Sequence, residues 1–442
     1  MESVLSRRAF LRGAAAAGAA GAIPAACTPL SPKAAPPPPP RGGAAPEDEA
    51  YWKMVRRCFL LDPAITHMNN GTLGPMPASV LRGVTERMTW QALDPDGYHC
   101  PGDRNLYARV EAARRRIAAF TGADPDEVAF TRNTTEAMNI VAAGIRMREG
   151  DEVLTTDHEH GGGLGCWEKK ALREGIVLKK VKLPVPPESR EQILERFEAA
   201  LTPRTRLISV SHVTCTTGLR LPVKEICRMA HARGILVCVD GAQTVGWLPL
   251  DLHDLDCDFY ANSPHKWLLC PMGTGFLYVK KRHIPEVEAL IVNSGFEGRR
   301  DTIKKFESVG TRNLPETAAV GDAVDFLEAI GIHAVARRDY YLAARLKEGL
   351  RGMKGVESLS AMADGLSSPL TSIRLYGPDG KRLPVEAVHR AFSERHRIRV
   401  RRVGEYHLDA IRVSTHLYNS PACVDRFLEA VEDLTRNGVK GA

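Results

Sequence analysis

Short apolar runs alternate with longer amphipathic segments along most of the chain after residue 47. The apolar runs have the length and β-branched content of buried strands, whereas the amphipathic segments repeat their apolar positions at helical spacing. Strands that alternate with helices predict an α/β fold, with a mostly parallel sheet and helices on both of its faces. The expected strands are 127–131, 151–157, 206–213, 234–240 and 276–281, and the expected helices include 134–145 and 223–234, the second closed by Gly234.

The pattern changes after about residue 320. Residues 316–331 begin a long helical stretch, 367–377 and 397–403 look like strands, and 423–438 form a closing helix. We therefore predict a large sheet-containing domain over 66–320. We also predict a smaller α+β domain over 321–442, on which 47–65 pack. Ligands of parallel α/β sheets bind beyond the carboxyl ends of the strands, so the polar residues there are the candidates for chemistry.

The first 46 residues lack these patterns and are predicted to lie outside the fold. Arg7 and Arg8, followed by a Phe-Leu pair and an Ala/Gly-rich run, resemble a twin-arginine signal peptide over 1–27. Residues 28–46 are expected to be a proline-rich linker. The sequence thus predicts export by the twin-arginine route to the periplasm, with lipidation of Cys27 and a membrane tether left open.

Composition changes this picture in two ways. The chain has 60 Lys and Arg against 53 Asp and Glu, so its net charge of +7 is a mild excess. The densest basic cluster, 114–116, falls in a helical pattern and is expected to be a solvated helix face rather than a nucleic-acid site. The ten cysteines lack zinc-site spacing, so no metal is predicted, and Cys238 is expected in the core. Whether disulfide bonds form is left open, because an exported protein enters an oxidising compartment.

Lys266 is the first candidate for chemistry. It lies in the sequence ANSPHKW after a short apolar run, where a partly desolvated amine becomes available as a neutral nucleophile. Asp240 ends a strand that is otherwise apolar, so its carboxylate needs a partner. The pyridinium nitrogen of pyridoxal 5′-phosphate (PLP) would be such a partner, with Lys266 as the Schiff-base lysine and Gln243 near the phenolic oxygen. A helix N-cap at the turn is the alternative role for Asp240.

Two further segments carry groups that suit a phosphate and an aromatic ring. Thr134 and Thr135 lie where a helix begins, and the backbone N–H groups and hydroxyls there bind anions. Simple N-capping is the alternative. Ser263 and His265 are additional phosphate donors. His160 precedes three glycines, which let the backbone pass close to a ligand, so its imidazole is predicted to stack on the pyridine ring.

These blocks occur in an order that resembles the class V aminotransferase family, which contains cysteine desulfurases and isopenicillin N epimerase. The motifs are TRNTTEAMN, EH followed seven residues later by Trp167, DGAQ, and SPHKW, and the resemblance covers about 50–435. It implies a PLP-dependent transferase of fold type I. Lys266 and His160 are then the catalytic residues, in a cofactor site formed by Thr134, Thr135, His160, Asp240, Gln243, Ser263, His265 and Lys266.

The resemblance also implies groups beyond this set. ESVGTRN resembles the loop that completes the phosphate site of a neighbouring subunit, here through Thr311, which implies a homodimer with shared active sites. IRVSTHLYNS matches the segment whose arginine binds the substrate carboxylate, so Arg412 takes that role. MNNGTLGPMP resembles the turn over the substrate, near Asn70 and Gly71.

Two departures narrow the predicted activity. The segment 400–412 has no cysteine, so persulfide-forming desulfuration is not expected, and Cys215 stands where desulfurases have an asparagine. We therefore predict an epimerase-like enzyme that acts at Cα of a small-molecule amino acid, with Lys266 as acid and base. Tyr406 and His407 are candidates for a second acid. The alternatives are a C–S lyase working by β-elimination, an aminotransferase, and an exported non-catalytic binding protein.

Overall fold

The computed structural model describes residues 43–439 apart from 100 and 103. The predicted signal peptide, Cys27 and most of the predicted linker lie outside the described residues, so export remains a prediction. Among the helices of the described part, none is long and apolar enough to cross a membrane. The α-helices are α2 (Glu49–Arg56), α3 (Ala78–Leu93), α4 (Leu106–Thr121), α5 (Thr134–Gly144), α6 (Gly161–Glu174), α7 (Arg190–Ala200), α8 (Val223–His231), α9 (Leu252–Leu255), α10 (Leu314–Ile330), α11 (Ile332–Leu350), α12 (Val385–Glu394) and α13 (Pro421–Asn437).

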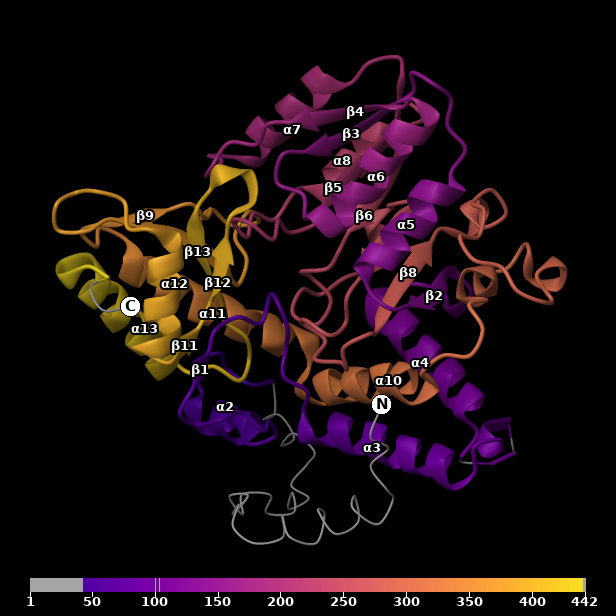
Figure 1. The fold of residues 1–442 in the computed structure, drawn as a ribbon, viewed down its shortest axis with the longest axis horizontal. Coiled ribbons are helices and arrows are strands. Elements are labelled where there is room, and N and C mark those ends of the chain that lie inside the picture. The colour runs from indigo at the N-terminus through magenta and orange to yellow at the C-terminus, as the bar shows by residue number, and fades with distance from the viewer. Residues whose placement is uncertain (1–42, 100, 103, 440–442) are drawn as a thin grey trace, which may run out of the picture. The chain divides into compact units, whose positions relative to one another are not determined.

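A seven-stranded sheet with the order β2-β8-β7-β6-β5-β3-β4 forms the centre of the fold (Figure 1). Within this sheet β8 runs in the opposite direction to the other strands, which confirms the predicted mostly parallel α/β sheet. Each of the five strands expected in this region is present. The strands are β2 (Val128–Thr131), β3 (Glu152–Thr156), β4 (Val177–Val181), β5 (Thr205–Ser211), β6 (Leu236–Asp240), β7 (Phe259–Asn262) and β8 (Gly275–Val279).

Alternate residues of these strands face two separate hydrophobic cores. In β6, Val237 and Val239 pack into the core that includes residues of α7 and α8, whereas Cys238 packs with residues of α5 and α6. Because successive side chains of a strand point to opposite faces, helices cover both faces of the sheet, as predicted. Cys238 is fully buried, which confirms its expected place in the core. In the described part of the chain, Cys238 and seven other cysteines are free thiols.

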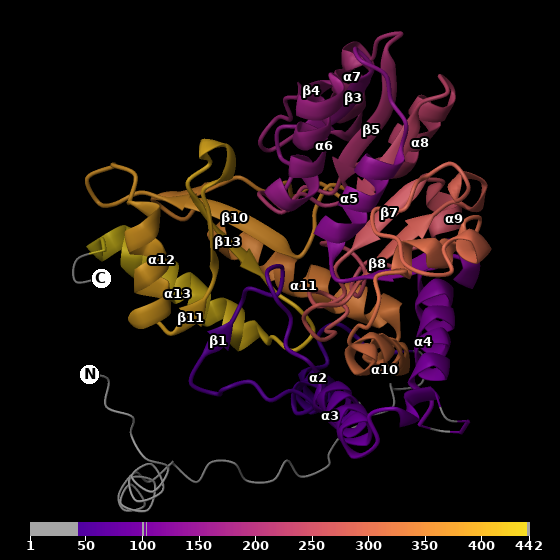
Figure 2. The same ribbon diagram turned by 45° about the vertical axis from the view of Figure 1, so that its right-hand side comes forward.

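A second sheet, antiparallel and with the order β12-β13-β10-β9, lies in the C-terminal part beside α11, α12 and α13 (Figure 2). The segment 397–403, expected as one strand, is divided between two sheets. Its first half pairs in parallel with β1 and its second half pairs with β13, because the two halves find different partners. The strands involved are β1 (Thr66–His67), β9 (Val356–Ser358), β10 (Leu370–Leu375), β11 (Ile398–Arg399), β12 (Arg401–Val403) and β13 (Ala410–Ser414).

The N-terminal helix α2 contacts this C-terminal part. Glu49 forms an ion pair with the buried Arg338 of α11, and Arg56 donates to the carbonyl oxygen of Tyr418 at 2.7 Å. Buried residues of α2 also belong to the core that includes residues of α4 and α10, so the assignment of 47–65 to the C-terminal domain stays a prediction. The boundaries of the two predicted domains stay a prediction.

The structure corrects one part of the prediction for the cluster 114–116. Arg115 and Arg116 are exposed, as expected for a solvated helix face. Arg114 is only 3% exposed, forms an ion pair with the buried Glu307 and donates to the carbonyl oxygen of Val128 at 2.6 Å. The helical period turns this one position toward the sheet, where a buried carboxylate neutralises it.

Candidate active site

A cavity of about 290 Å³ lies at the carboxyl ends of β5, β6 and β7. This is the edge of the sheet at which a ligand was expected. The predicted residues that line the cavity are Gly71, Thr134, Thr135, His160, Asp240, Gln243, Ser263, His265 and Lys266. The lining is completed by Thr72, Asn133, Gly163, Ser211, Val213, Cys215, Ala242 and Arg401.

Lys266 is presented by the turn that follows β7. Its neighbour Trp267 is fully buried and donates from Nε1 to Oε1 of Gln243 at 2.8 Å, which fixes the turn. Gly74 passes so close to the carbonyl oxygen of Lys266 that a Cβ would clash. The amine has no hydrogen bond to any residue that the structure describes, and burial lowers its pKa although the charge of Asp240 opposes this shift. Such a lysine is available as a neutral nucleophile.

Asp240 closes β6, whose other residues are apolar. Its Oδ1 accepts the backbone N–H of Ala242 at 2.9 Å, so one oxygen shapes the turn after β6. The next helix that the structure describes begins at Leu252, so this contact is not the helix N-cap of the alternative role. Its Oδ2 lies beside Gly163, where a Cβ would stand only 2.7 Å away. The absence of a side chain at Gly163 therefore leaves room beside the second oxygen, and Asp240 itself lines the cavity.

The amino end of α5 forms an anion-binding corner of the cavity. Asn133 caps the helix, since its Oδ1 accepts the N–H of Glu136 at 3.0 Å, so neither threonine is needed as the cap. The hydroxyl and the backbone N–H of Thr134 lie 2.8 and 3.0 Å from Oγ of Ser263. Thr135 lines the cavity beside them. Hydroxyls at the positive end of a helix dipole suit a phosphate.

Two neutral imidazoles line the same cavity. His160 caps α6, and its Nδ1 accepts the N–H of Gly162 at 3.0 Å, so its neutral ring carries the proton on Nε2. Burial, together with the charge of Lys266, lowers the pKa of His160. His265 lies with Nδ1 3.3 Å from the carbonyl oxygen of Thr274, and burial lowers its pKa as well. A neutral imidazole suits stacking on an aromatic ring, the role predicted for His160.

Arg412, on β13, is a buried cation behind the cavity wall. It is 1% exposed, and it donates to the carbonyl oxygen of Cys215 at 2.8 Å and to Oγ1 of Thr72 at 3.0 Å. Among the described residues no carboxylate pairs with it, and its Nε has no hydrogen-bond partner. Burial, followed by the charge of Arg401, lowers its pKa to about 9. A buried guanidinium with neutral partners is well suited to bind a carboxylate.

The amides of Gln243 and Asn70 tie the walls of the cavity together. Nε2 of Gln243 donates to the carbonyl oxygen of Gly71 at 2.8 Å, while Oε1 accepts from Trp267. Asn70 is fully buried and donates to the carbonyl oxygen of Lys266 at 3.3 Å, so it supports the Lys266 turn and is not among the lining residues. The contacts predicted from these two side chains to cofactor and substrate stay predictions.

Sequence reasoning missed two charged residues at this site. Arg401 lines the cavity from β12, and the alternation of arginine with apolar residues over 397–403 is the signal that could have identified it. Glu159 is 4% exposed, and its two carboxylate oxygens accept from the hydroxyls of Thr156 and Ser211 at 2.6 Å each. Burial raises the pKa of Glu159 to about 7, although these hydrogen bonds oppose the shift.

The two candidates for a second acid differ in their surroundings. The hydroxyl of Tyr406 donates to the carbonyl oxygen of Glu159 at 2.7 Å, and its ring stacks on His158. His407 is exposed. Both residues have left-handed backbones, with φ of +54° and +56°. Neither is among the residues that line the cavity, so a role for either at Cα stays a prediction.

Thr311 lies outside this cavity. It lines a second cavity of about 420 Å³, together with Gly310 and Arg312 in the loop before α10. One chain therefore does not bring Thr311 to Lys266. Its predicted role concerns a neighbouring subunit and stays a prediction.

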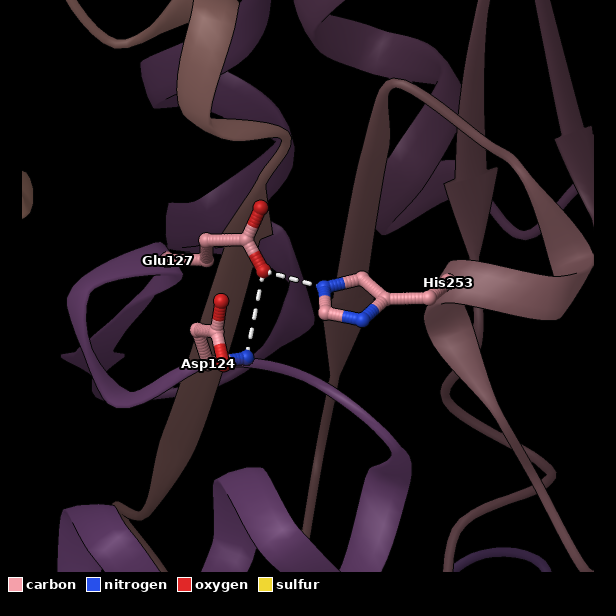
Figure 3. Close-up of side chains that lie close together, drawn as sticks. All are labelled: Asp124, Glu127 and His253. Atoms are coloured by element: carbon pink, nitrogen blue, oxygen red, sulfur yellow. Dashed lines mark hydrogen bonds and ion pairs between the residues drawn. The ribbon is translucent and has the colours of Figure 1, made fainter.

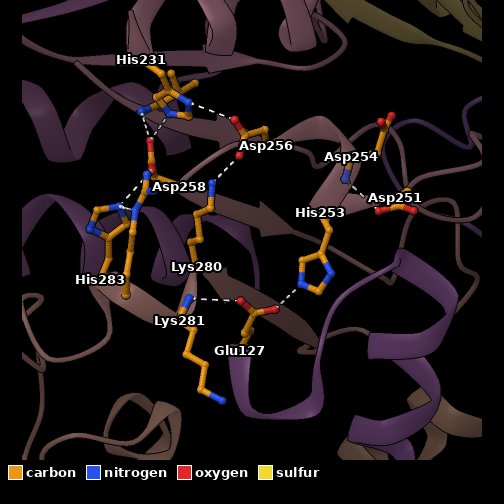
Figure 4. Close-up of polar contacts among 12 residues, drawn as sticks. Glu127, His231, Asp251, His253, Asp254, Asp256, Asp258, Lys280, Lys281 and His283 are labelled. Carbon is orange, nitrogen blue, oxygen red and sulfur yellow. Dashed lines mark hydrogen bonds and ion pairs between the residues drawn. The ribbon is translucent and has the colours of Figure 1, made fainter. Parts of the chain in front are cut away.

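A separate polar cluster lies at the opposite edge of the sheet. Asp124, Glu127 and His253 point toward one another, with ligand atoms within 4.8 Å (Figure 3). Oε2 of Glu127 accepts from the N–H of Asp124 at 3.1 Å and lies 2.6 Å from Nε2 of His253, while Oε1 accepts the N–H of Lys281. Helix capping and an ion pair account for these contacts. The cluster continues into a network around the buried Asp258 (Figure 4).

The chain is similar to proteins of one family over most of its length. A model of the family described as Aminotransferase class-V matches residues 75–427. Isopenicillin N epimerase of Amycolatopsis lactamdurans is 36% identical, covering 87% of this chain and 99% of that protein. A probable cysteine desulfurase of Methanothermobacter thermautotrophicus is 32% identical, covering 69% and 76%. A lysine-to-alanine mutant of C-DES, solved with glycine covalently linked to its PLP cofactor, has a TM-score of 0.76 and 25% identity, covering 86% of this chain and 99% of that one.

The residues at the cavity fit the polar groups of PLP. The corner at the start of α5 offers hydroxyls and a helix dipole to the phosphate. Oδ2 of Asp240 has space beside Gly163, where it can meet the ring nitrogen. The amine of Lys266, without a hydrogen-bond partner in the described part of the chain, can meet the aldehyde. The phosphate, the ring nitrogen and the aldehyde of the cofactor thus each have a chemically matched partner.

Proposed function

Because the chain belongs to the class-V aminotransferase family and is a PLP-dependent enzyme, we propose that it changes the configuration at Cα of a small-molecule amino acid. The identity of 36% to an isopenicillin N epimerase across nearly the whole of that protein supports this reaction. The absence of cysteine from 400–412 also supports it, because persulfide formation needs a nucleophilic thiol. The lyase, the aminotransferase and the non-catalytic alternatives are not favoured.

In this proposal the cofactor is held by groups from four segments of the chain. Lys266 attaches it covalently, Asp240 pairs with the ring nitrogen, His160 stacks on the ring and Gln243 contacts its oxygen. The phosphate is assigned to Thr134, Thr135, Ser263 and His265. When bound, PLP supplies an electron sink that stabilises negative charge at Cα of the substrate.

The protein's own groups then bind the substrate and move the proton. Arg412 binds the α-carboxylate, because it is a buried cation with only neutral partners. Lys266 removes the proton at Cα from one face through its desolvated amine, and inversion requires that a proton is delivered to the opposite face. Epimerisation needs a second acid on the other face, for which Tyr406 and His407 are the candidates. If Tyr406→Phe and His407→Ala both leave turnover intact, this assignment is wrong.

The observation that carries the proposal is a cavity lined by Lys266 and Asp240, with the buried cation of Arg412 behind its wall. A direct test incubates the purified holoenzyme with a panel of L-amino acids in D2O. We expect the D-enantiomer to form and deuterium to enter at Cα, measured by chiral chromatography and mass spectrometry. Release of sulfide and pyruvate would instead identify a lyase, and turnover that requires a keto acid would identify an aminotransferase.

We further propose a homodimer with shared active sites, in which Thr311 of one subunit completes the phosphate site of the other. The proposal is supported by the position of Thr311 outside the Lys266 cavity of its own chain. Mixed dimers of Lys266→Ala and Thr311→Ala subunits test it, since one of the two sites would then keep both residues. Recovery of activity on mixing is expected, and no recovery would contradict a shared site.

Export by the twin-arginine route to the periplasm remains part of the proposal. Arg7 and Arg8 precede an Ala/Gly-rich run, and Cys27 leaves lipidation open. Replacing both arginines by lysine is expected to leave the protein in the cytoplasm. Labelling of the wild-type chain with a fatty-acid probe, lost in Cys27→Ser, would establish the lipid tether.

A further inference from the structure

Two arginines stand directly opposite each other at the active site. Arg401 on β12 and Arg412 on β13 are paired residues of an antiparallel ladder. Their guanidinium groups converge on one atom, the carbonyl oxygen of Cys215, at 3.4 and 2.8 Å. Like charges in directly opposite positions destabilise a sheet, so this arrangement needs a compensating anion.

The two cations have different partners. Arg412 is 1% exposed and hydrogen-bonded only to neutral oxygens, and its Nε, buried, has no partner in the described part of the chain. Arg401 lines the cavity and forms an ion pair with Glu405, four residues along the same segment. In the described part of the chain, the carboxylate of Glu405 is thus the one that forms an ion pair with either of these two guanidinium groups.

The ion pair between Glu405 and Arg401 is weak enough for another carboxylate to replace Glu405. The side chains of Arg401 and Glu405 are 21% and 27% exposed, and partly solvated pairs of this kind are weak. Glu405 also opens a turn whose next residues, Tyr406 and His407, have left-handed backbones. A non-glycine residue in this region is held at a cost in free energy, so a second arrangement of the turn is within reach.

We propose that Arg401 binds a second carboxylate, on the side chain of an acidic amino-acid substrate, while Arg412 binds the α-carboxylate. The carboxylate of Glu405 stays paired with Arg401 until the substrate carboxylate displaces Glu405. The exchange replaces one anion by another, so the half-buried Arg401 keeps a charged partner throughout. This inference rests on the proposed function, since it assigns the α-carboxylate to Arg412, and it adds the class of substrate.

The test compares acids with their amides on the holoenzyme. L-glutamate against L-glutamine, and L-aspartate against L-asparagine, differ in the distal charge alone. Dissociation constants come from calorimetric titration, and KM and kcat from chiral chromatography. Wild type is expected to prefer the acid of a pair. Arg401→Met should reduce that preference by about 10- to 100-fold, the range for losing a charged hydrogen bond, and Arg401→Lys should retain part of it.

A matched pair of residues provides the control. Arg402 follows Arg401 on β12 and also pairs with a glutamate, Glu386, but both side chains are at least half exposed and neither lines the cavity. Arg402→Met should therefore leave the preference for the acid unchanged. Glu405→Gln should increase the affinity for the acid and hardly affect the amide, because Arg401 loses its internal competitor.

Three results would overturn the inference while leaving the proposed function intact. Wild type could process both members of a pair equally, Arg401→Met could weaken acid and amide by the same factor, or Glu405→Gln could leave the affinity for the acid unchanged. The second result would mean that Arg401 serves the α-carboxylate instead. Failure of wild type to exchange the Cα proton of any amino acid would contradict the proposed function itself, and the inference would fall with it.

Discussion

Two buried aspartates on opposite edges of the same sheet differ in how many partners the protein provides for their carboxylates. Asp258 precedes β7 and is fully buried. It lies 2.8 Å from Nε2 of His231 (Figure 4). It also accepts from Nη2 of Arg282 at 2.9 Å and from the N–H of Val237 at 2.8 Å. Asp240 ends β6 at the other edge, and its carboxylate accepts one hydrogen bond within the described chain, from the N–H of Ala242.

The difference separates structural charge from functional charge. At the Asp258 edge the protein supplies every partner itself, and Lys280 and Lys281 extend the network to Asp256 and Glu127. At the cavity, Asp240, Lys266 and Arg412 are held in place by the backbone but left without a full set of protein partners. Buried groups that are incompletely satisfied are expected where a ligand completes them.

The largest effect is expected from Lys266→Ala. Removal of the amine takes away both the covalent anchor and the acid–base group, so activity should fall by at least about 10³-fold. The melting temperature of the apoenzyme should change little, because the amine has no protein partner in the described residues. Lys280→Ala is the control from the other edge, where activity should persist. Equal losses of activity in the two variants would contradict the distinction between functional charge at the cavity and structural charge at the Asp258 edge.

Exchanging the two aspartates for asparagine sharpens the comparison further. Asp240→Asn should lower kcat about 100-fold or more, since it weakens the partner of the ring nitrogen, with little change in stability. Asp258→Asn should destabilise the fold by about 3 kcal/mol, because it leaves several donors around a buried site without their charge partner. Activity per folded molecule should be retained. Urea unfolding followed by fluorescence, beside initial rates, separates these outcomes.

The two edges should respond to pH in different ways. At the Asp258 edge, burial opposes ionisation but hydrogen bonds from His283 and His231 hold the pKa of Asp258 well below its usual range. Burial lowers the pKa of His283, but hydrogen bonds to Asp258 and Glu286 outweigh this and raise it. The contribution of Asp258 to the free energy of unfolding is therefore lost as pH falls from the pKa of the unfolded state toward the lower pKa of the folded state. The contribution of His283 is lost as pH rises through its raised pKa in the folded state.

Beside the cavity, burial raises the pKa of Glu159 to about 7, above its value in the unfolded chain. The folded state then binds the proton more tightly, so stability should decline between about pH 4.5 and 7, by the order of 3 kcal/mol in total. Glu159→Gln should remove this slope, whereas Asp258→Asn should remove the loss at acid pH. Melting curves across pH 4 to 9 measure both. An unchanged slope in Glu159→Gln would show that its carboxyl is not protonated in the folded state.

The smallest effect is expected from His253, at the rim of the fully paired edge. Its side chain is 49% exposed, so the ion pair with Glu127 is largely screened by water. His253→Gln should destabilise the protein by less than about 1 kcal/mol. Zinc should not raise the melting temperature of wild type, because Glu127 already accepts from two backbone N–H groups. A zinc-dependent stabilisation lost in His253→Gln would contradict this account of the cluster.

Most of the large sheet could be predicted from the sequence, because strands such as β6 and β8 carry continuous apolar runs. Strand β4, with the sequence VLKKV, was not predicted, because two lysines interrupt its apolar run. Asp240 and Lys266 stood out as charged residues at the ends of such runs. Arg401 did not, since residues 397–403 read as one strand while their two halves pair with different strands. Arg114 was mistaken for a surface residue because its neutralising partner, Glu307, is 193 residues away in sequence. Partners distant in sequence cannot be read from local periodicity.

The most direct test of the central claim locates the cofactor on the chain. The holoenzyme is treated with sodium borohydride, which converts the bond between the cofactor and its lysine into a stable amine, then digested and mapped by mass spectrometry. We predict a phosphopyridoxyl group on the peptide that contains Lys266, and none in the Lys266→Ala variant. Modification of another lysine in wild type, or an unmodified Lys266 peptide, would contradict the claim.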